Sequence, residues 1–141
     1  MLYPLRKIIL YHCKRLYHWI IAVAANVYYR KPSEKMIVIG VTGTNGKSTT
    51  VKLISEILSF CGKKVGFIST SEIQIGKKRW LNNMKMTMPG RFILQKYLRQ
   101  MVDVGCEYAI IETSSQGIEQ FRHIGINYDV VLFTNLTPEH I

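Results

Sequence analysis

The spacing of apolar side chains divides the chain into one long helix and a following series of strands and helices. In the first stretch, residues 3–29, apolar residues recur at intervals of three and four, and "KPS" then ends the helix. Its longest uncharged run, residues 16–29, is shorter than the roughly 20 residues that a membrane-spanning helix needs. The apolar stripe consists of Leu5, Ile8, Ile9, His12, Leu16, Trp19, Ile20, Val23 and Val27.

Short apolar runs rich in β-branched residues predict the strands of the remaining chain. Residues 71–83 alternate between apolar and polar positions, which is typical of a hairpin, and "GKK" supplies its turn. The other strands are expected within residues 36–41, 63–70, 107–111 and 128–134.

Helical periodicity predicts two further helices between these strands. The first follows "TGTNG", ends at Gly62, and is expected to bury Val51, Ile54 and Leu58 together with Leu53 and Ile57. The second begins after a Pro-Gly pair, ends at Gly105, and is expected to bury Ile93 or Leu94, Tyr97, Leu98, Met101 and Val102.

The alternation of strands and helices predicts an α/β fold with a P-loop-type, mostly parallel sheet flanked by helices. Residues 1–35 are interpreted as a separate basic and apolar helical segment that precedes this domain, and residues 36–141 as the domain itself.

Composition and charge narrow the range of functions. Hydrophobic residues make up 48% of the chain and charged residues 20%, which is ordinary for a folded protein and argues against disorder. The net charge of +10 is uneven, because residues 1–35 hold seven of the 19 Lys and Arg and only one acid, Glu34. A solvated basic helix accounts for most of this charge. The remainder suits a polyanionic small substrate as well as DNA, and no nucleic-acid partner is expected.

The basic N-terminal helix has three interpretations. It packs on the next domain or a partner, which is the favoured one, or it makes a peripheral contact with a membrane surface. The third is a signal peptide, with "AVAA" as a cleavage site, but export would separate the nucleotide loop that follows from ATP. A cytoplasmic location is therefore expected, with contact at the inner face of the membrane as an option.

The three cysteines, Cys13, Cys61 and Cys106, are odd in number and far apart, which argues against disulfides and metal ligation. Cys61 and Cys106 lie among apolar residues and are expected to be buried thiols in a reducing compartment.

The segment "GVTGTNGKSTT" lies between an expected strand and an expected helix, which is the context of a phosphate-binding loop. Gly43 and Gly46 permit a tight turn and a close approach of the backbone to an anion. The helix N-terminus then directs N–H groups toward that anion. Lys47 can reach the outer phosphates of a nucleotide, and the Ser48 hydroxyl is placed to ligate Mg²⁺.

A second group of candidate residues follows the later strands. Ligands of open parallel sheets bind beyond the carboxyl ends of the strands, so Glu112 at the end of its strand is well placed for Mg²⁺. The last strand runs into "NLTPEH", which brings Asn135, Glu139 and His140 to the same edge.

Four motifs resemble those of the Mur ligases, the ATP-dependent amide-forming enzymes that build the peptidoglycan peptide. "TGTNGKS" resembles their ATP loop, "ETSSQ" their E-x-S-S-H box, and "FTNLTPEH" their F-T-N-L-x-x-D-H element. "TMP" resembles the T-T-P element of the subgroup that adds the third amino acid. The resemblance covers residues 36–141, is greatest to UDP-N-acetylmuramoyl-tripeptide synthetases, and implies the N-terminal portion of their central ATP-binding domain.

The resemblance also implies roles for individual residues. Catalytic roles fall to Lys47 and His140, and Mg²⁺ would be bound by Ser48, Glu112 and His140. The residues that would bind ATP are Gly43, Thr44, Asn45, Gly46, Lys47, Ser48, Thr49 and Asn135. Those that would bind a muramyl-peptide-like acceptor are Thr87, Met88, Ser114, Gln120 and Arg122.

The chain departs from the family pattern in several places. Val41 replaces the first glycine of the strict P-loop pattern, Gln116 the histidine of the S-S-H box, and Glu139 the aspartate before His140. Met88 replaces the second threonine of T-T-P. Residues 1–35 do not resemble the uridine-nucleotide-binding first domain of the family. These differences concern the acceptor more than phosphate or metal binding.

The resemblance implies ligation through an acyl phosphate, in which a substrate carboxylate attacks the γ-phosphate of ATP and an amino acid then attacks the product. Further ATP contacts and an amino-acid-binding domain lie downstream in the family, so the chain is interpreted as truncated. It is expected to bind Mg-ATP weakly and not to ligate. The alternatives are a folylpolyglutamate-synthase-like ligase, another P-loop class such as a small kinase or partition-type ATPase, and a non-catalytic nucleotide-binding module.

Overall fold

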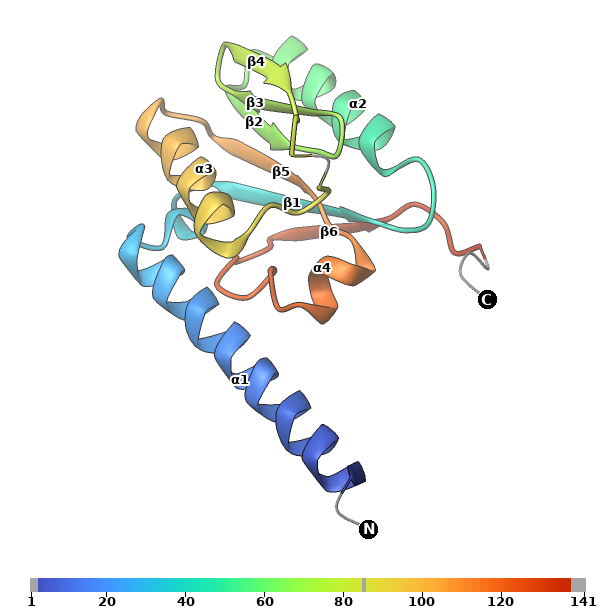
Figure 1. Ribbon diagram of the computed structural model, residues 1–141. Helices are drawn as coiled ribbons and strands as arrows, with labels where there is room; N and C mark the ends of the chain where they lie inside the picture. The colour runs from blue at the N-terminus through green and yellow to red at the C-terminus, as the bar shows by residue number, and fades with distance from the viewer. Residues whose placement is uncertain (1–2, 85, 138–141) are drawn as a thin grey trace.

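A computed structural model describes residues 3–84 and 86–137, with the side chains from Tyr11 onward. It confirms an α/β fold with an N-terminal helix, in which helices cover both faces of a six-stranded sheet (Figure 1). In chain order, the elements are α1 Tyr3–Tyr28, the short 3-10 helix η1 Pro32–Lys35, β1 Ile37–Thr42, α2 Lys47–Phe60, β2 Val65–Ile68, β3 Glu72–Ile75, β4 Lys78–Leu81, α3 Arg91–Asp103, β5 Tyr108–Glu112, α4 Ser115–Glu119 and β6 Val130–Phe133.

The sheet has the strand order β4-β3-β2-β5-β1-β6, and every expected strand is present. Strands β2, β5, β1 and β6 are mutually parallel, whereas the β3–β4 hairpin adds two antiparallel strands at one edge. The register pairs Val41 of β1 with Glu112 of β5. The glycine loop after β1 and the polar residues after β5 therefore lie at the same carboxyl edge of the sheet.

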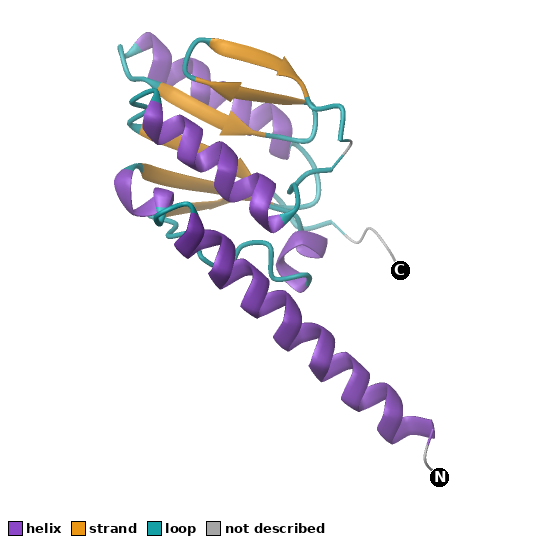
Figure 2. Cartoon of the chain, turned by 60° about the vertical axis from the view of Figure 1, so that its left-hand side comes forward, coloured by secondary structure: helices purple, strands orange, loops and turns teal. Residues whose placement is uncertain are grey.

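The two faces of the sheet carry separate apolar cores. On one face, Val51 of α2 packs against Val41, Phe67 and Ile110. On the other face lies α3 (Figure 2). It buries Leu94, Leu98 and Met101 on β-strand residues that include Val38, Ile73 and Ile111. Both helices thus bury the side that faces the strands, as the α/β pattern requires.

Two expectations about burial near α2 were wrong. Leu53 and Ile57 are 57% and 62% exposed, because the helix turns Val51 and Ser55 toward the sheet instead. Apolar residues occupy more than half of the circumference of α2, so periodicity alone did not define the buried side. Cys61 is exposed because it lies in the turn that ends α2, whereas Cys106 is buried as expected.

Helix α1 packs on the domain through small residues and not through its apolar stripe. Ala22 and Ala25 are fully buried, and the rings of Tyr28 and Tyr29 contact Phe92 of α3. The N-terminal half of α1 projects away from the domain (Figure 1). The division of the chain at residue 35 stays a prediction, since the second half of α1 shares an interface with α3.

Arg79 connects the edge strand β4 to two neighbouring elements. Its Nε donates to Glu72 Oε2 at 3.1 Å, and its Nη1 donates to Glu56 Oε1 of α2 at 3.2 Å. The hydrogen bond from Arg79 holds the pKa of Glu72 below its ordinary value. The stabilisation is therefore present above the ordinary carboxyl pKa and is lost as the pH falls through the pKa of folded Glu72.

We expect Arg79→Met to lower the free energy of unfolding by about 1 kcal/mol near neutral pH, and by much less near pH 3. Urea unfolding at the two pH values measures the difference. Lys78→Met, on the same strand and without an ion pair among the described residues, serves as the control and should change stability little. A loss for Arg79→Met that is equal at both pH values would show that lost packing, and not the ion pair, carries the effect.

Candidate functional site

The glycine loop connects β1 to α2 at the carboxyl edge of the sheet. Gly43 has φ +132° and Gly46, which caps α2, has φ +80°, so both positions favour glycine. A Cβ at Gly43 would lie 2.2 Å from Thr134 Oγ1, which leaves no room for a side chain. The loop is therefore closely packed against the end of β6 and presents the first turn of α2 to the carboxyl edge of the sheet.

The ammonium group of Lys47 lies over this loop. Its Nζ donates to the carbonyl oxygens of Gly43 at 2.8 Å and Thr44 at 2.6 Å. The positive charge is thus held beside the N-terminus of a 14-residue helix, whose dipole adds to the attraction for an anion.

Glu112 carries the buried carboxylate of the site, with only 2% of the residue exposed. It accepts hydrogen bonds from Ser48 Oγ at 2.7 Å, Thr70 N at 2.8 Å and Thr70 Oγ1 at 2.9 Å. No described Lys, Arg or His forms an ion pair with it. Burial of a carboxylate without an ion pair is costly, and the three hydrogen bonds offset part of that cost.

The donor set around Glu112 suits magnesium. A carboxylate and a serine hydroxyl are hard oxygen ligands, and Mg²⁺ in phosphoryl-transfer sites is bound by one or two such groups together with water and phosphate. Within residues 3–84 and 86–137, no three His, Cys, Asp or Glu side chains gather into a metal cluster.

The segment after β6 fixes the shape of the loop. Asn135 Oδ1 accepts from the backbone N of Asn45 at 3.0 Å, and Asn135 Nδ2 donates to the Asn45 carbonyl at 3.1 Å. Thr134 Oγ1 donates to the same carbonyl at 2.8 Å. Thr44 and Thr137 also exchange hydrogen bonds, at 3.2 Å and 3.0 Å. Asn135 therefore contacts loop backbone, and its expected contact with a nucleotide stays a prediction.

We expect Asn135→Ala to weaken Mg-ATP binding about tenfold, because it removes two hydrogen bonds that hold the loop in shape. Isothermal titration calorimetry measures the change. Asn83→Ala is the matched control, since Asn83 is exposed and its side chain forms no hydrogen bond with the described part of the loop. Wild-type affinity in Asn135→Ala would show that the loop keeps its shape without this clamp.

Two adjoining cavities open beside the loop. The first, about 390 Å³, extends from Gly43, Thr44 and Lys47 to the start of α4. The second, about 320 Å³, continues from there toward Arg122. Both cavities are lined by Thr87, Ser114 and Gln116.

The second cavity collects the residues expected to bind an acceptor. Its lining includes all five of them, which come from three separate parts of the sequence: Thr87, Met88, Ser114, Gln120 and Arg122. The Arg122 guanidinium donates to the Met88 carbonyl and, through Nη2, to Gln120 Oε1 at 2.7 Å. Burial lowers the pKa of Arg122, and burial together with the nearby Arg122 charge lowers that of Arg91. Arg122 lines this end of the cavity, and the Arg91 charge lies near it.

For three other predicted residues, the described part of the structure gives no contact with the site. Thr49 lies exposed in the first turn of α2, and its role is untested. His140 and Glu139 lie outside the described residues. Met86 and Gln116 line the second cavity although the sequence did not mark them as binding residues.

Thr70 is the functional-site residue that sequence reasoning missed. It supplies two of the three hydrogen bonds to Glu112, and because its one hydroxyl proton goes to that carboxylate, its Oγ1 accepts from Thr87 Oγ1 at 2.9 Å. The sequence did contain a clue to Thr70, which belongs to the Ser/Thr cluster after β2. Because β2 and β5 are parallel neighbours, residues at their carboxyl ends lie close together, and Glu112 ends β5.

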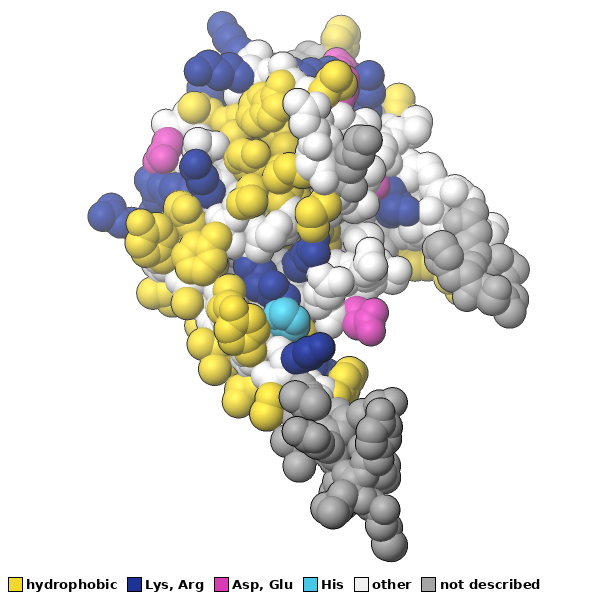
Figure 3. Space-filling model, viewed as in Figure 1, with side chains coloured by type: hydrophobic (Ala, Val, Ile, Leu, Met, Phe, Trp, Pro, Cys, Tyr) yellow, Lys and Arg dark blue, Asp and Glu magenta, His cyan; other side chains and the backbone are white. Residues whose placement is uncertain are grey.

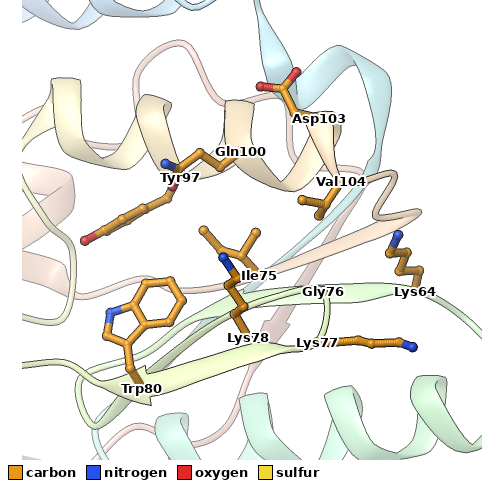
Figure 4. Close-up of a pocket in the computed structure, with 10 residues that line it drawn as sticks. All are labelled: Lys64, Ile75, Gly76, Lys77, Lys78, Trp80, Tyr97, Gln100, Asp103 and Val104. Atoms are coloured by element: carbon orange, nitrogen blue, oxygen red, sulfur yellow. The ribbon is translucent and has the colours of Figure 1, made fainter.

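A further cavity, of about 600 Å³, lies between α3 and the β3–β4 hairpin and contains none of the predicted site residues. Trp80, Tyr97 and Ile75 provide its apolar wall, and Lys64, Lys77 and Lys78 approach it from the strand ends and the hairpin (Figure 4). Its position away from the loop separates it from the candidate site.

Comparison with known proteins identifies ligases that act on muramyl peptides, by their names, among the relatives of this chain. Residues 41–141 match the family model described as "Mur ligase middle domain". The chain is 42% identical over 120 residues to the UDP-N-acetylmuramoyl-L-alanyl-D-glutamate--2,6-diaminopimelate ligase of Geobacillus kaustophilus, covering 85% of this chain and 24% of the relative. It is 44% identical over 115 residues to the UDP-N-acetylmuramyl-tripeptide synthetase of Treponema denticola, covering 80% and 22%.

A solved structure agrees with these matches. The structure of a UDP-N-acetylmuramoyl-L-alanyl-D-glutamate--2,6-diaminopimelate ligase superposes with a TM-score of 0.67 at 30% identity, covering 75% of this chain and 21% of that one. The chain thus spans about a quarter of the length of the relatives that it matches. The family match, the sequence identity and the shared fold agree, and the chain belongs to the Mur ligase family through its middle domain.

Proposed function

We propose that the chain is the ATP-binding portion of an ATP-dependent ligase that adds an amino acid to a muramyl-peptide-like acceptor in cell-wall synthesis. One observation carries the proposal: Lys47, Ser48 and the buried Glu112 meet at the sheet edge, beside a cavity that ends at Arg122. Such an arrangement places a phosphate cradle next to a site for an anionic acceptor.

The loop side of the site would hold the nucleotide. The backbone around residues 43–48 and the Lys47 ammonium would bind the β- and γ-phosphates by charge-assisted hydrogen bonds. Ser48 and Glu112 would hold Mg²⁺, which supplies charge neutralisation at those phosphates. His140, proposed for a second metal ion, lies outside the described residues.

The acceptor side would bind and orient a carboxylate. Arg122 and Gln120 lie at the far end of the second cavity, and Thr87 and Ser114 lie where the two cavities join. An oxygen of the acceptor carboxylate forms a bond to the γ-phosphorus, and the bond from that phosphorus to the β,γ-bridging oxygen breaks, which releases ADP. The amino group of the incoming amino acid then attacks the acyl carbon. Phosphate leaves, the amine loses a proton, and an amide remains.

Both reactants of the first step are anions, so the site must reduce their repulsion. Lys47 next to the α2 N-terminus and the Arg91–Arg122 pair at the acceptor end provide positive charge on both sides of the junction. Preorganised charge of this kind is the largest single contribution in many phosphoryl-transfer sites.

The acceptor is inferred from the diaminopimelate ligases among the relatives, whose names specify UDP-N-acetylmuramoyl-L-alanyl-D-glutamate. Met88 and Gln116 line the acceptor cavity at positions where the Mur ligase motifs carry other residues, so they are the side chains expected to alter acceptor preference. Residues 36–141 would act in the cytoplasm, where ATP is available, and residues 1–35 would serve a separate role.

The test supplies the native polypeptide with ATP, Mg²⁺ and radiolabelled amino acids, with or without UDP-N-acetylmuramoyl-L-alanyl-D-glutamate. We expect ADP release and label incorporation only when acceptor and amino acid are both present. ATP hydrolysis at the same rate with and without the acceptor would favour a nucleotide-binding module without ligase activity. Incorporation into a pteroyl-glutamate acceptor instead would favour the folylpolyglutamate-type alternative.

A further inference from the structure

Helix α1 presents two opposite faces, and only one of them is used by the domain. His18, Ala22 and Ala25 face the domain, and the two alanines are almost completely buried. The opposite side of the helix carries Leu16, Ile20 and Val27. Leu16 and Ile20 are two positions from His18, and Val27 is two positions from Ala25, which corresponds to a rotation of about 200° around the helix axis. They are 58%, 51% and 61% exposed. We call Leu16, Ile20 and Val27, with the half-buried Val23 between them, the outer face of α1.

An exposed aromatic side chain adjoins the outer face. In Figure 3, hydrophobic side chains line the edge of α1 that points away from the sheet. Trp19, which is 47% exposed, is three positions from Leu16 and four from Val23, so it lies about 60° and 40° from them around the helix. Tyrosine and tryptophan are enriched at the interface between lipid and water, where an apolar ring and a polar tip are both satisfied.

The positive charge of residues 1–31 indicates what kind of partner binds the outer face of α1. Residues 1–31 contain six Lys or Arg and no Asp or Glu. A second copy of α1 carries the same positive charge and no acid on the helix, so it offers no charge complementarity. An anionic lipid surface supplies the missing negative charge and an apolar layer at once, and basic residues near such a surface strengthen binding.

The length and attachment of α1 fit binding in the plane of a membrane. Its 26 residues correspond to about 39 Å of helix. Contacts with the domain fix its direction, since Arg15 lies over the Phe121 ring at 5.1 Å and the rings of Tyr28 and Tyr29 contact Phe92. Within residues 3–84 and 86–137, no helix combines the length and the apolarity needed to cross a bilayer.

We propose that the outer face of α1 docks the protein on anionic membranes, with the helix lying in the lipid headgroup region and the α/β domain on the aqueous side. The α1 residues that face the domain remain packed in this arrangement. The second cavity then lies near the membrane surface, because Phe121, beside Gln120 and Arg122, contacts Arg15 of the docked helix. The proposal does not depend on the proposed ligase function.

The test compares two matched double variants of residues 1–141 in vesicle co-sedimentation. Leu16→Glu with Ile20→Glu adds two acids to the outer face, whereas Leu53→Glu with Ile57→Glu adds two acids to residues of the same types and of similar exposure on α2. The vesicles contain phosphatidylcholine alone or phosphatidylcholine with phosphatidylglycerol. We expect wild type and the α2 variant to bind the anionic vesicles, and the α1 variant to bind them more than about tenfold more weakly.

Fluorescence provides a second measurement that does not rely on sedimentation. Because the chain has two tryptophans, Trp80→Phe leaves Trp19 as the single reporter. Its emission should shift to shorter wavelength with anionic vesicles and return as salt is raised, since screening weakens the attraction. Thermal unfolding of each variant verifies that it is folded.

Several results would overturn the proposal. They are an absence of wild-type binding, equal binding of neutral and anionic vesicles, and equal losses in the α1 and α2 variants. A dimer without lipid affinity that the α1 variant dissociates would assign the outer face to a second copy of the chain instead. Each of these outcomes leaves the nucleotide site untouched, so Mg-ATP binding in the same samples separates this proposal from the proposed function.

Discussion

Lys47→Ala is expected to weaken Mg-ATP binding by about 100-fold or more, while the fold remains intact. The Lys47 ammonium lies within 2.8 Å of two loop carbonyls at the N-terminus of α2, where it can turn to the outer phosphates of a nucleotide. Loss of a charge-assisted contact with a phosphate in a partly enclosed site costs about 3 kcal/mol, which corresponds to this change in affinity.

Calorimetry with ATP and Mg²⁺ measures the effect of Lys47→Ala. Lys52→Ala is the control, since Lys52 lies on the same helix, carries the same charge and is exposed, 3.8 Å from Glu72. It should change the affinity by no more than about twofold, as expected for a surface ion pair. Equal losses in the two variants would mean that net charge, and not the position of Lys47, attracts the nucleotide.

Glu112 variants are expected to separate metal binding from folding. Its carboxylate is buried and accepts three hydrogen bonds from Ser48 and Thr70, with no ion pair to a described cation. Glu112→Gln keeps the volume and can keep these bonds, because the amide oxygen accepts from Ser48 and Thr70 N while the amide nitrogen donates to Thr70 Oγ1. We expect its free energy of unfolding without ligand to stay within about 1 kcal/mol of wild type.

The same substitution removes the charged ligand of the proposed magnesium site. Magnesium-dependent strengthening of ATP binding should therefore be lost in Glu112→Gln, although the protein is folded. Glu112→Ala should in addition unfold more easily, by about 2–4 kcal/mol, because it leaves buried donors unsatisfied. Urea unfolding and titration of ATP with and without Mg²⁺ measure the two effects. A magnesium dependence that persists in Glu112→Gln would rule out Glu112 as a ligand.

Local sequence patterns predicted most of the fold because its strands and helices are distinct in composition. The β-branched runs gave β1, β2, β5 and β6, and "GKK" gave the hairpin turn between β3 and β4. The place of Glu112 could also be predicted, since a carboxylate at the end of a parallel strand must lie at the ligand-binding edge. The short helix α4 was missed because its five residues carry too few periods for a helical pattern.

Contacts between distant segments were harder to predict. The pairing of Thr70 with Glu112, and of Asn135 with the loop at Asn45, depends on strand order, which periodicity does not encode. The packing side of α1 was missed for a related reason. The apolar stripe suggested the interface, but close helix packing on α3 uses the small side chains of Ala22 and Ala25 and leaves Leu16 and Ile20 exposed.

The central claim is that the loop around Lys47 and the buried Glu112 form one cradle for Mg²⁺ and the triphosphate of ATP. A crystal structure of residues 1–141 with Mg²⁺ and a non-hydrolysable ATP analogue tests it most directly. The account predicts the β- and γ-phosphates against the backbone of the loop and the Lys47 ammonium, with the metal bound by Ser48 Oγ and a Glu112 oxygen. A nucleotide bound elsewhere, or a metal that leaves Glu112 hydrogen-bonded only to Ser48 and Thr70, would contradict it.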